Sequence, residues 1–134
     1  MATLDDVRRI ALELPEVFEE AGGSFAWRTK KGLVVWQRGP RKSDLVQLEK
    51  LGRAWPDATV VAVRVTGDDD KQMLLAAYPE SVFTIPHFDG YPAVLVRLDT
   101  TDDELLRDLI VEAWKLRVTR RQIEQWLASN PSHP

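Results

Sequence analysis

The sequence predicts an α+β domain, in which an antiparallel sheet of about five strands has helices packed on one face. Two segments, residues 24–38 and 81–98, each have the pattern of a β-hairpin. Segments with helical spacing of apolar residues stand between and after these hairpins, and no run of βαβ units is present. A length of 134 residues corresponds to one domain, so we expect residues 1–134 to form a single unit.

The N-terminal segment predicts a helix over residues 3–14. Thr3 can cap its start, and Asp5 and Asp6 suit the positive end of the helix dipole. Pro15 ends it. One apolar stripe runs along the helix and comprises Leu4, Val7, Ile10, Ala11 and Leu14. We expect this stripe to pack on the sheet.

The first hairpin is expected to turn at Lys31-Gly32. This register places Trp27 opposite Trp36 on a face that belongs to the core. The opposite face is mostly polar and comprises Ala26, Arg28, Lys30 and Gln37.

A basic loop over residues 39–44 follows the hairpin and is expected to end in a helix cap, Ser43 or Asp44. The next elements are, in order, a helix over 45–55, an alternating strand over 58–65 and a short helix over 67–78. Three acids, Asp68 to Asp70, open the short helix and Pro79 stops it.

The second hairpin is expected over residues 85–94, because Asp89-Gly90 between extended residues is a strong hairpin signal. Pro86 and Pro92 lack an N–H, so this hairpin should project from the sheet as a stiff wing. The strands should bury Phe83, Ile85, Val94 and Val96. The wing should expose two aromatic rings, those of Phe88 and Tyr91.

Two further helices are predicted after the second hairpin. A capping box from Thr101 to Glu104 opens the first, and a box from Thr119 to Gln122 opens the second. The first is clearly amphipathic through Leu105, Leu106, Leu109, Ile110, Ala113 and Leu116. Residues 118–134 are expected to be a C-terminal helix and a loose tail.

Composition excludes several classes of function. The chain has no cysteine, so a disulfide, a thiolate metal site and a cysteine nucleophile are impossible. No apolar run approaches the roughly 20 residues that cross a bilayer, which predicts a cytoplasmic protein without a membrane partner. The net charge of −3 is uneven, because residues 28–53 carry eight bases and two acids.

No motif in the sequence predicts catalysis. His87 has no second histidine or cysteine at the spacing of metal ligands, so we expect no catalytic residue, no bound metal and no cofactor. Two acidic clusters are present, Asp68 to Asp70 and Asp102 to Glu104. Both stand at predicted helix starts, where capping and the helix dipole favour acids.

Several segments resemble the MmcQ/YjbR family of small bacterial proteins. These are "FAW" (25–27), "RKSDL" (41–45), "LLAAYPESVFTIPHFDGYPAVLVRLD" (74–99) and "LRDLIVEAW" (106–114). The resemblance implies a fold like that of CyaY, the bacterial frataxin, and a DNA-binding protein with a "double wing" motif and no catalytic residues. The same fold analogy leaves metal binding by the acidic clusters at 68–70 or 102–104 open as an alternative. Relative to that pattern, residues 40–66 add a basic loop, a helix and a strand.

We therefore expect a small cytoplasmic binding protein that is not an enzyme and binds DNA weakly and without sequence preference. The two wings and the basic loop would supply the contacts, through Lys30, Lys31, Arg38, Arg41, Lys42, His87, Phe88 and Tyr91. The alternative is a protein-interaction or chaperone-like module with no role at nucleic acid. An exposed apolar patch would favour that alternative.

Overall fold

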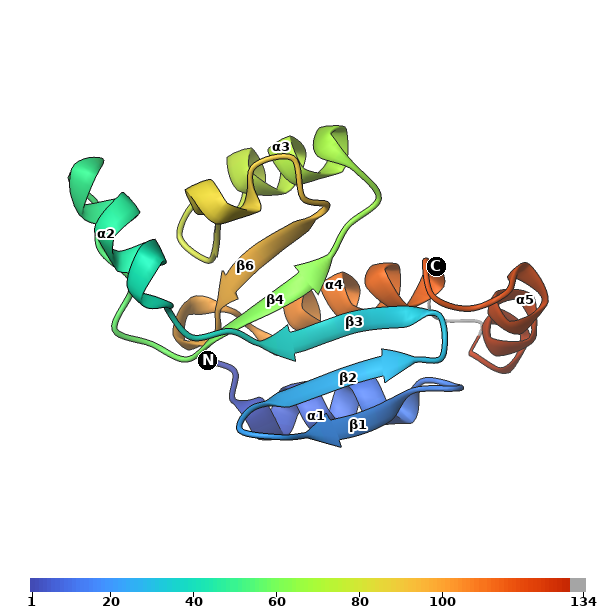
Figure 1. Ribbon diagram of the computed structural model, residues 1–134. Helices are drawn as coiled ribbons and strands as arrows, with labels where there is room; N and C mark the ends of the chain where they lie inside the picture. Colours follow the sequence, from blue (N-terminus) through green and yellow to red (C-terminus); the bar gives the residue numbers. More distant parts are fainter. Residues whose placement is uncertain (131–134) are drawn as a thin grey trace.

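The computed structural model describes residues 1–130, so the loose tail predicted at the C-terminus lies almost wholly outside the described residues (Figure 1). The elements are, in chain order, α1 (Leu4–Glu13), β1 (Phe18–Ala21), β2 (Phe25–Thr29), β3 (Gly32–Gln37), α2 (Lys42–Lys50), β4 (Val60–Arg64), α3 (Asp68–Ala77), β5 (Val82–Phe83), the 3-10 helix η1 (Pro86–Phe88), β6 (Ala93–Arg97), the 3-10 helix η2 (Leu98–Thr100), α4 (Asp103–Lys115) and α5 (Arg120–Ser129).

The six strands form one antiparallel sheet in the order β1-β2-β3-β4-β6-β5, which confirms the predicted α+β class. The strand that was not predicted is β1, at the edge of the sheet. Its four residues are all exposed, so the alternation of apolar and polar residues that marks a half-buried strand is absent. Its backbone pairs with β2, with Phe18 opposite Arg28 and Ala21 opposite Phe25.

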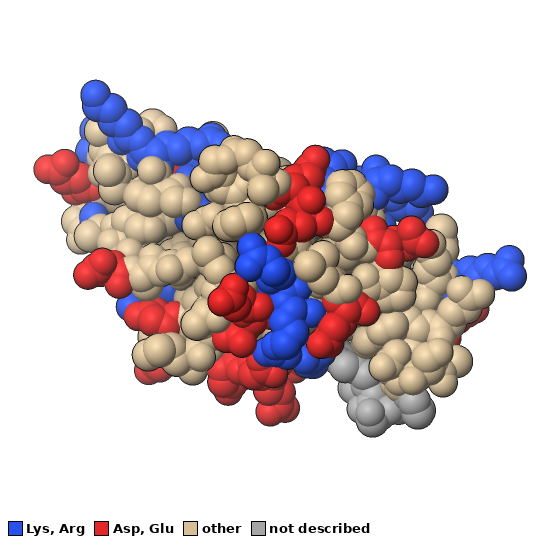
Figure 2. All heavy atoms as spheres, turned by 90° about the horizontal axis from the view of Figure 1, so that it is seen from below, with Lys and Arg blue, Asp and Glu red and all other residues tan. Residues whose placement is uncertain are grey.

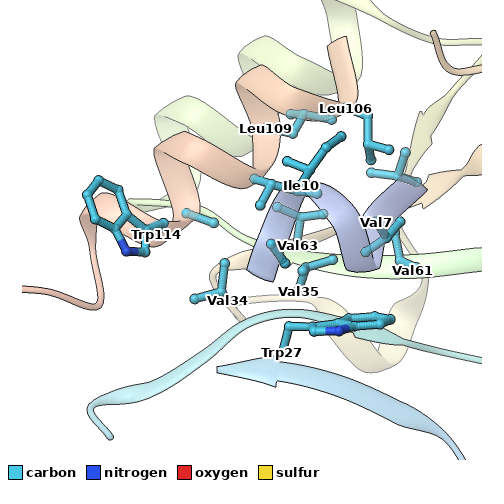
Figure 3. Close-up of a cluster of buried hydrophobic side chains, with 14 of the residues drawn as sticks. Val7, Ile10, Trp27, Val34, Val35, Val61, Val63, Leu106, Leu109 and Trp114 are labelled. Atoms are coloured by element: carbon cyan, nitrogen blue, oxygen red, sulfur yellow. The ribbon is translucent and has the colours of Figure 1, made fainter. Parts of the chain in front are cut away.

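One face of the sheet is covered by α1 and α4, and the main core lies between these layers (Figure 3). Val7 and Ile10 from α1 lie near Leu106 and Leu109 from α4, above the valines of β3 and β4, and Trp114 lies further along α4 in the same cluster. The indole N–H of Trp114 donates to the Pro15 carbonyl at 2.8 Å, which ties α4 to the end of α1.

The opposite face carries a smaller core at one end, beneath α2 and η1. Leu48 is the one apolar side chain that α2 buries there. It packs with Ile85, Phe88 and the strand residues Val60, Ala62, Ala93 and Leu95. Helices therefore cover both faces at this end of the sheet, whereas we expected them on one face only.

The first hairpin turns at Lys30-Lys31, one residue earlier than predicted, because Thr29 pairs with Gly32. The register shifts between Trp27 and Arg28. A bulge of this kind places an extra residue in one strand and moves the following side chains to the other face. Trp27 accordingly lies opposite Val35, and Trp36 joins the smaller core on the other face.

The predicted second wing is wrong. The paired strands are only Val82–Phe83 and part of β6, and Pro86 to Phe88 form η1. Asp89 has φ −60° and ψ 127°, Gly90 has φ +74°, and the Tyr91 N–H donates to the Phe88 carbonyl, so a type II turn replaces the type I′ turn.

The physical reason is that this segment curls onto the sheet instead of projecting. Phe88 packs into the smaller core and is buried, although we expected an exposed ring. The ammonium group of Lys71 donates to the carbonyls of Phe88, at 2.6 Å, and Tyr91, at 3.0 Å, and so holds the turn down. Three of the four strand residues expected in the core are buried, and Phe83 is half-buried.

The cap residues of α1 and α5 are the predicted ones, whereas those of α2 and α4 differ from the prediction. Thr3 and Thr119 form capping boxes, and the second is the one predicted. α4 is capped by Asp102, because the hydroxyl of Thr101 donates instead to the Arg97 carbonyl. α2 begins after Arg41, and Asp44 lies inside the helix and accepts from the Arg41 N–H. Asp68 to Asp70 stand in the first turn of α3, as expected.

Candidate nucleic-acid interface

Arg38 cannot make the phosphate contact that we expected of it, because its side chain is buried. Its Nη2 atom lies 2.9 Å from Oδ2 of Asp44, which is also buried. The guanidinium carbon stands 5.6 Å from the centre of the Phe88 ring, and Nη1 donates to the Gly39 carbonyl. Arg38 and Phe88 are therefore part of the packing beneath α2 and η1.

The remaining predicted bases do not form one patch. Lys30 and Lys31 are exposed at the turn before β3, and Arg41 and Lys42 are exposed beyond its other end. The six residues of β3 span roughly 20 Å at about 3.3 Å per residue. Salt at physiological strength screens exposed charges beyond about 8 Å, so the two pairs act separately.

His87 is exposed on η1, with its ring 6.2 Å from that of Phe88. Burial raises the pKa of the neighbouring Asp44, but the hydrogen bond from the Arg41 backbone, the close guanidinium of Arg38 and the positive charge of His87 outweigh it and lower that pKa. Across residues 1–130, no three His, Asp or Glu side chains are grouped so that they could hold a metal ion.

The structure does bring a different set of bases together, beside the turn between β2 and β3. Arg117 follows α4 and reaches across this turn, where its Nε donates to the Leu33 carbonyl at 3.0 Å. Burial, and then the positive charge of Arg64 and that of Arg28, lower the pKa of Arg117. Arg28 pairs with Leu33, so Arg28 and Arg117 lie at the same end of the sheet as the two turn lysines. We call this set the basic face: Arg28, Lys30, Lys31, Arg64 and Arg117.

Of the two aromatic residues predicted to contact nucleic acid, Tyr91 borders the basic face. Its side chain is 37% exposed, and the guanidinium carbon of Arg64 lies 5.5 Å from the centre of its ring. The ring of Trp36 meets it edge-on at 6.4 Å. An aromatic ring beside arginines offers a nucleic acid a surface for stacking as well as charge.

The cations of the basic face have few anionic partners. Arg28 lies 3.6 Å from Glu20, and no ion pair reaches Lys30, Lys31, Arg64 or Arg117 from residues 1–130. Charges near α1 and β1 behave differently, because bases and acids alternate there in the view from below (Figure 2). Pairs such as Arg8 with Glu19 and Arg9 with Asp103, both at 2.7 Å, neutralise that surface.

Sequence reasoning missed three members of the basic face, which are Arg28, Arg64 and Arg117. Arg64 had a signal, since alternation with the inward Val63 and Val65 places it on the opposite face of the strand. Arg117 had none, because it lies 84 residues from the Leu33 carbonyl that positions it. The sequence placed Arg28 and Lys30 on the polar face of the first hairpin. Nothing in the chain order indicated that Arg64 and Arg117 would lie beside them.

Gly32 allows Arg117 to cross the turn closely. Its φ is +146°, and a Cβ built there would stand 2.9 Å from Cζ of Arg117. We expect Gly32→Ala to displace the guanidinium and to lower the free energy of unfolding by about 1–3 kcal/mol. Urea unfolding measures this. Gly22→Ala is the control, because its Cβ meets open space, and an equal loss in both variants would contradict the prediction.

The fold and the site define a small α+β protein with an open, cationic sheet face. The YjbR family model matches residues 12–116, and the chain belongs to this family. This match spans residues 40–66, which we expected to be an addition to the family pattern. These residues supply β4, a central strand of the sheet.

The curated relatives carry no assigned function. The uncharacterised protein Rv2570 of Mycobacterium tuberculosis is 42% identical over 130 residues, which is 97% of this chain and 99% of the relative. The uncharacterised protein Mb2600 of Mycobacterium bovis matches to the same extent.

A solved structure shares the fold. The crystal structure of the Deinococcus radiodurans protein DR2400, described as a DUF419 domain, superposes with a TM-score of 0.64 at 21% identity, covering 93% of this chain and 88% of that one. No helix within residues 1–130 is long and apolar enough to cross a membrane.

Proposed function

We propose that this chain is a binding protein that contacts the phosphate backbone of DNA, without sequence preference, through the basic face. The observation that carries the proposal is that Arg117 binds the Leu33 carbonyl, opposite Arg28, beside an exposed two-lysine turn, with few carboxylates to neutralise these charges. Arg64 adds a further guanidinium over the neighbouring Tyr91 ring. Guanidinium groups bind phosphate oxygens through two parallel N–H donors, and lysines add mobile charge.

The proposed DNA contact uses the first predicted wing, the β2–β3 hairpin, and does not use the second, predicted over residues 85–94. Lys30 and Lys31 stand at the β2–β3 turn, where they can reach a phosphate, whereas the segment around Asp89 curls against the sheet. The whole chain has a net charge of −3, so the rest of the protein opposes a polyanion. Binding should therefore be weak and should disappear as salt rises.

Titration of a fluorescent DNA duplex at several low salt concentrations tests the proposal. Five phosphate contacts should give a slope of log affinity against log salt of about −4 to −5. The double variant Arg64→Gln/Arg117→Gln should reduce that slope by roughly two. Its far-ultraviolet circular dichroism should match that of the native protein, which shows that the fold is kept.

The matched control is Arg41→Gln/Lys42→Gln, which removes the same charge at the other end of β3. This control should leave the slope nearly unchanged. Equal effects of both double variants would mean that net charge alone governs binding, and no binding at the lowest salt would remove the DNA proposal.

A further inference from the structure

An apolar groove of about 290 Å³ lies between α3 and α4 beside the end of β4. Its walls include Val63, Leu74, Leu105 and Leu109, which belong to or pack against the main core. Three large apolar side chains stay exposed along it: Met73 at 60%, Tyr78 at 41% and Leu116 at 37%. Exposed apolar groups gathered in this way mark a contact surface.

Acids predominate at the edge of this groove. The groove is lined by three acids, Asp70, Asp108 and Glu112, and by two bases, Arg64 and Lys115. Lys115 is paired with Glu112 at 2.9 Å, and Arg64 lies over the Tyr91 ring. No ion pair reaches Asp108 from residues 1–130. The groove therefore suits an apolar partner that carries positive charge.

The helix α2 combines exposed apolar side chains with positive charge. Leu45, Val46 and Leu51 are each about half exposed, because only Leu48 of its apolar residues is buried. Four exposed bases flank these side chains: Arg41, Lys42, Lys50 and Arg53. The one acid among them that is exposed is Glu49, since Asp44 is buried against Arg38. A short helix with exposed apolar side chains and bordering bases is thus left without a partner among residues 1–130.

The groove and α2 cannot meet within one molecule. Leu48 packs by Val60 at the start of β4, whereas the groove lies beside Val63 and Val65 at its end. Figure 1 shows α2 near the start of β4, and α3 following its end. They also belong to opposite faces of the sheet, because α4 covers the main core and α2 covers the smaller one.

We propose that α2 of one copy docks into the α3–α4 groove of a second copy, head to tail. The two surfaces match in apolar character and are opposite in charge. The groove's volume is at the low end for a small-molecule site, and it suits a few inserted side chains. One short helix in one groove makes a small interface, so the association should be weak and depend on concentration. This inference does not rest on the proposed DNA binding.

A head-to-tail contact uses two different surfaces of the protein, so a variant of each surface can be tested separately. Each copy offers one α2 and one groove, so the native protein should form dimers and then longer chains. Val46→Lys should block the first surface and Met73→Lys the second, and both side chains are exposed, so each variant should still fold. Alone, each variant should remain monomeric.

Sedimentation velocity of the native protein, each variant and their equal mixture, without DNA, tests this arrangement. The mixture should restore association but stop at the dimer, because one intact helix meets one intact groove. Leu12→Lys, an exposed residue of α1 outside both surfaces, should associate like the native protein. A native protein that stays monomeric up to millimolar concentration, or a mixture that does not associate, would overturn the proposal.

Discussion

Replacing Asp44 by alanine should lower the free energy of unfolding by about 3–5 kcal/mol, because it leaves the guanidinium of Arg38 buried without a counter-charge. The side chains of Asp44 and Arg38 are 1% and 7% exposed, and their closest atoms lie 2.9 Å apart. Asp44 also accepts from the Arg41 N–H at 2.9 Å, so the substitution also removes a hydrogen bond at the start of α2. Urea unfolding gives the value.

The geometry of this pair suggests the matched control. Nη2 of Arg38 is close to Oδ2 of Asp44 but is not aligned as a hydrogen-bond donor, and Oδ1 of Asp44 has no hydrogen-bond partner. Asp44→Asn keeps an oxygen acceptor for Arg41, removes the charge and turns one carboxylate oxygen into an NH2 group, so it should lose less stability than Asp44→Ala. A loss below about 1 kcal/mol in the alanine variant would mean that water reaches Arg38.

Acid should weaken the same contact. The pKa of Asp44 is lowered in the folded protein, because hydrogen bonds and nearby positive charge outweigh its burial. A carboxyl whose folded pKa is below its unfolded pKa contributes stability that is present above the unfolded value, and that is lost as pH falls through the folded value. Native protein and Asp44→Asn should therefore approach each other in stability below about pH 4.

Replacing Trp114 by alanine should have an effect of similar size, about 3–5 kcal/mol, because it opens a large cavity in the main core. Trp114 is fully buried, and its ring meets that of Trp126 edge-on at 5.2 Å. The variant also loses the hydrogen bond to the Pro15 carbonyl. Equilibrium unfolding in urea measures the change.

Trp114→Phe separates the two contributions. It keeps an aromatic ring in the core and loses the N–H donor, so we expect a smaller loss of about 1–2 kcal/mol. Similar losses in both variants would assign the stability to the hydrogen bond and contradict the cavity argument. Arg117 lies three residues beyond Trp114, so loosening the end of α4 should also weaken DNA binding by the basic face.

Arg38 and Arg117 show why stability must be measured beside binding. Both are arginines near the ends of β3, and only Arg38 has a buried ion pair. An Arg38→Ala variant should unfold more easily and, while folded, should keep the salt dependence of the native protein. Loss of DNA binding in that variant would report on folding and not on a phosphate contact.

Features that depend on neighbours along the chain could be predicted from the sequence. The amphipathic spacing predicted α1 and α4, and the box at Thr119 predicted the start of α5. These agree because helix periodicity and capping join residues three or four positions apart. The α+β class followed from the order of such local elements. The quoted motifs also identified the family, which the match over residues 12–116 confirms.

Only the tertiary structure decided how distant segments meet. β1 is a strand because β2 offers it a backbone partner, although its own side chains carry no strand pattern. Asp89-Gly90 resembles a hairpin turn locally, but Lys71 and the burial of Phe88 select a different turn. The basic face depends on Arg117 reaching Leu33 across 84 residues. Contacts of that separation are set by packing, which no short window of sequence contains.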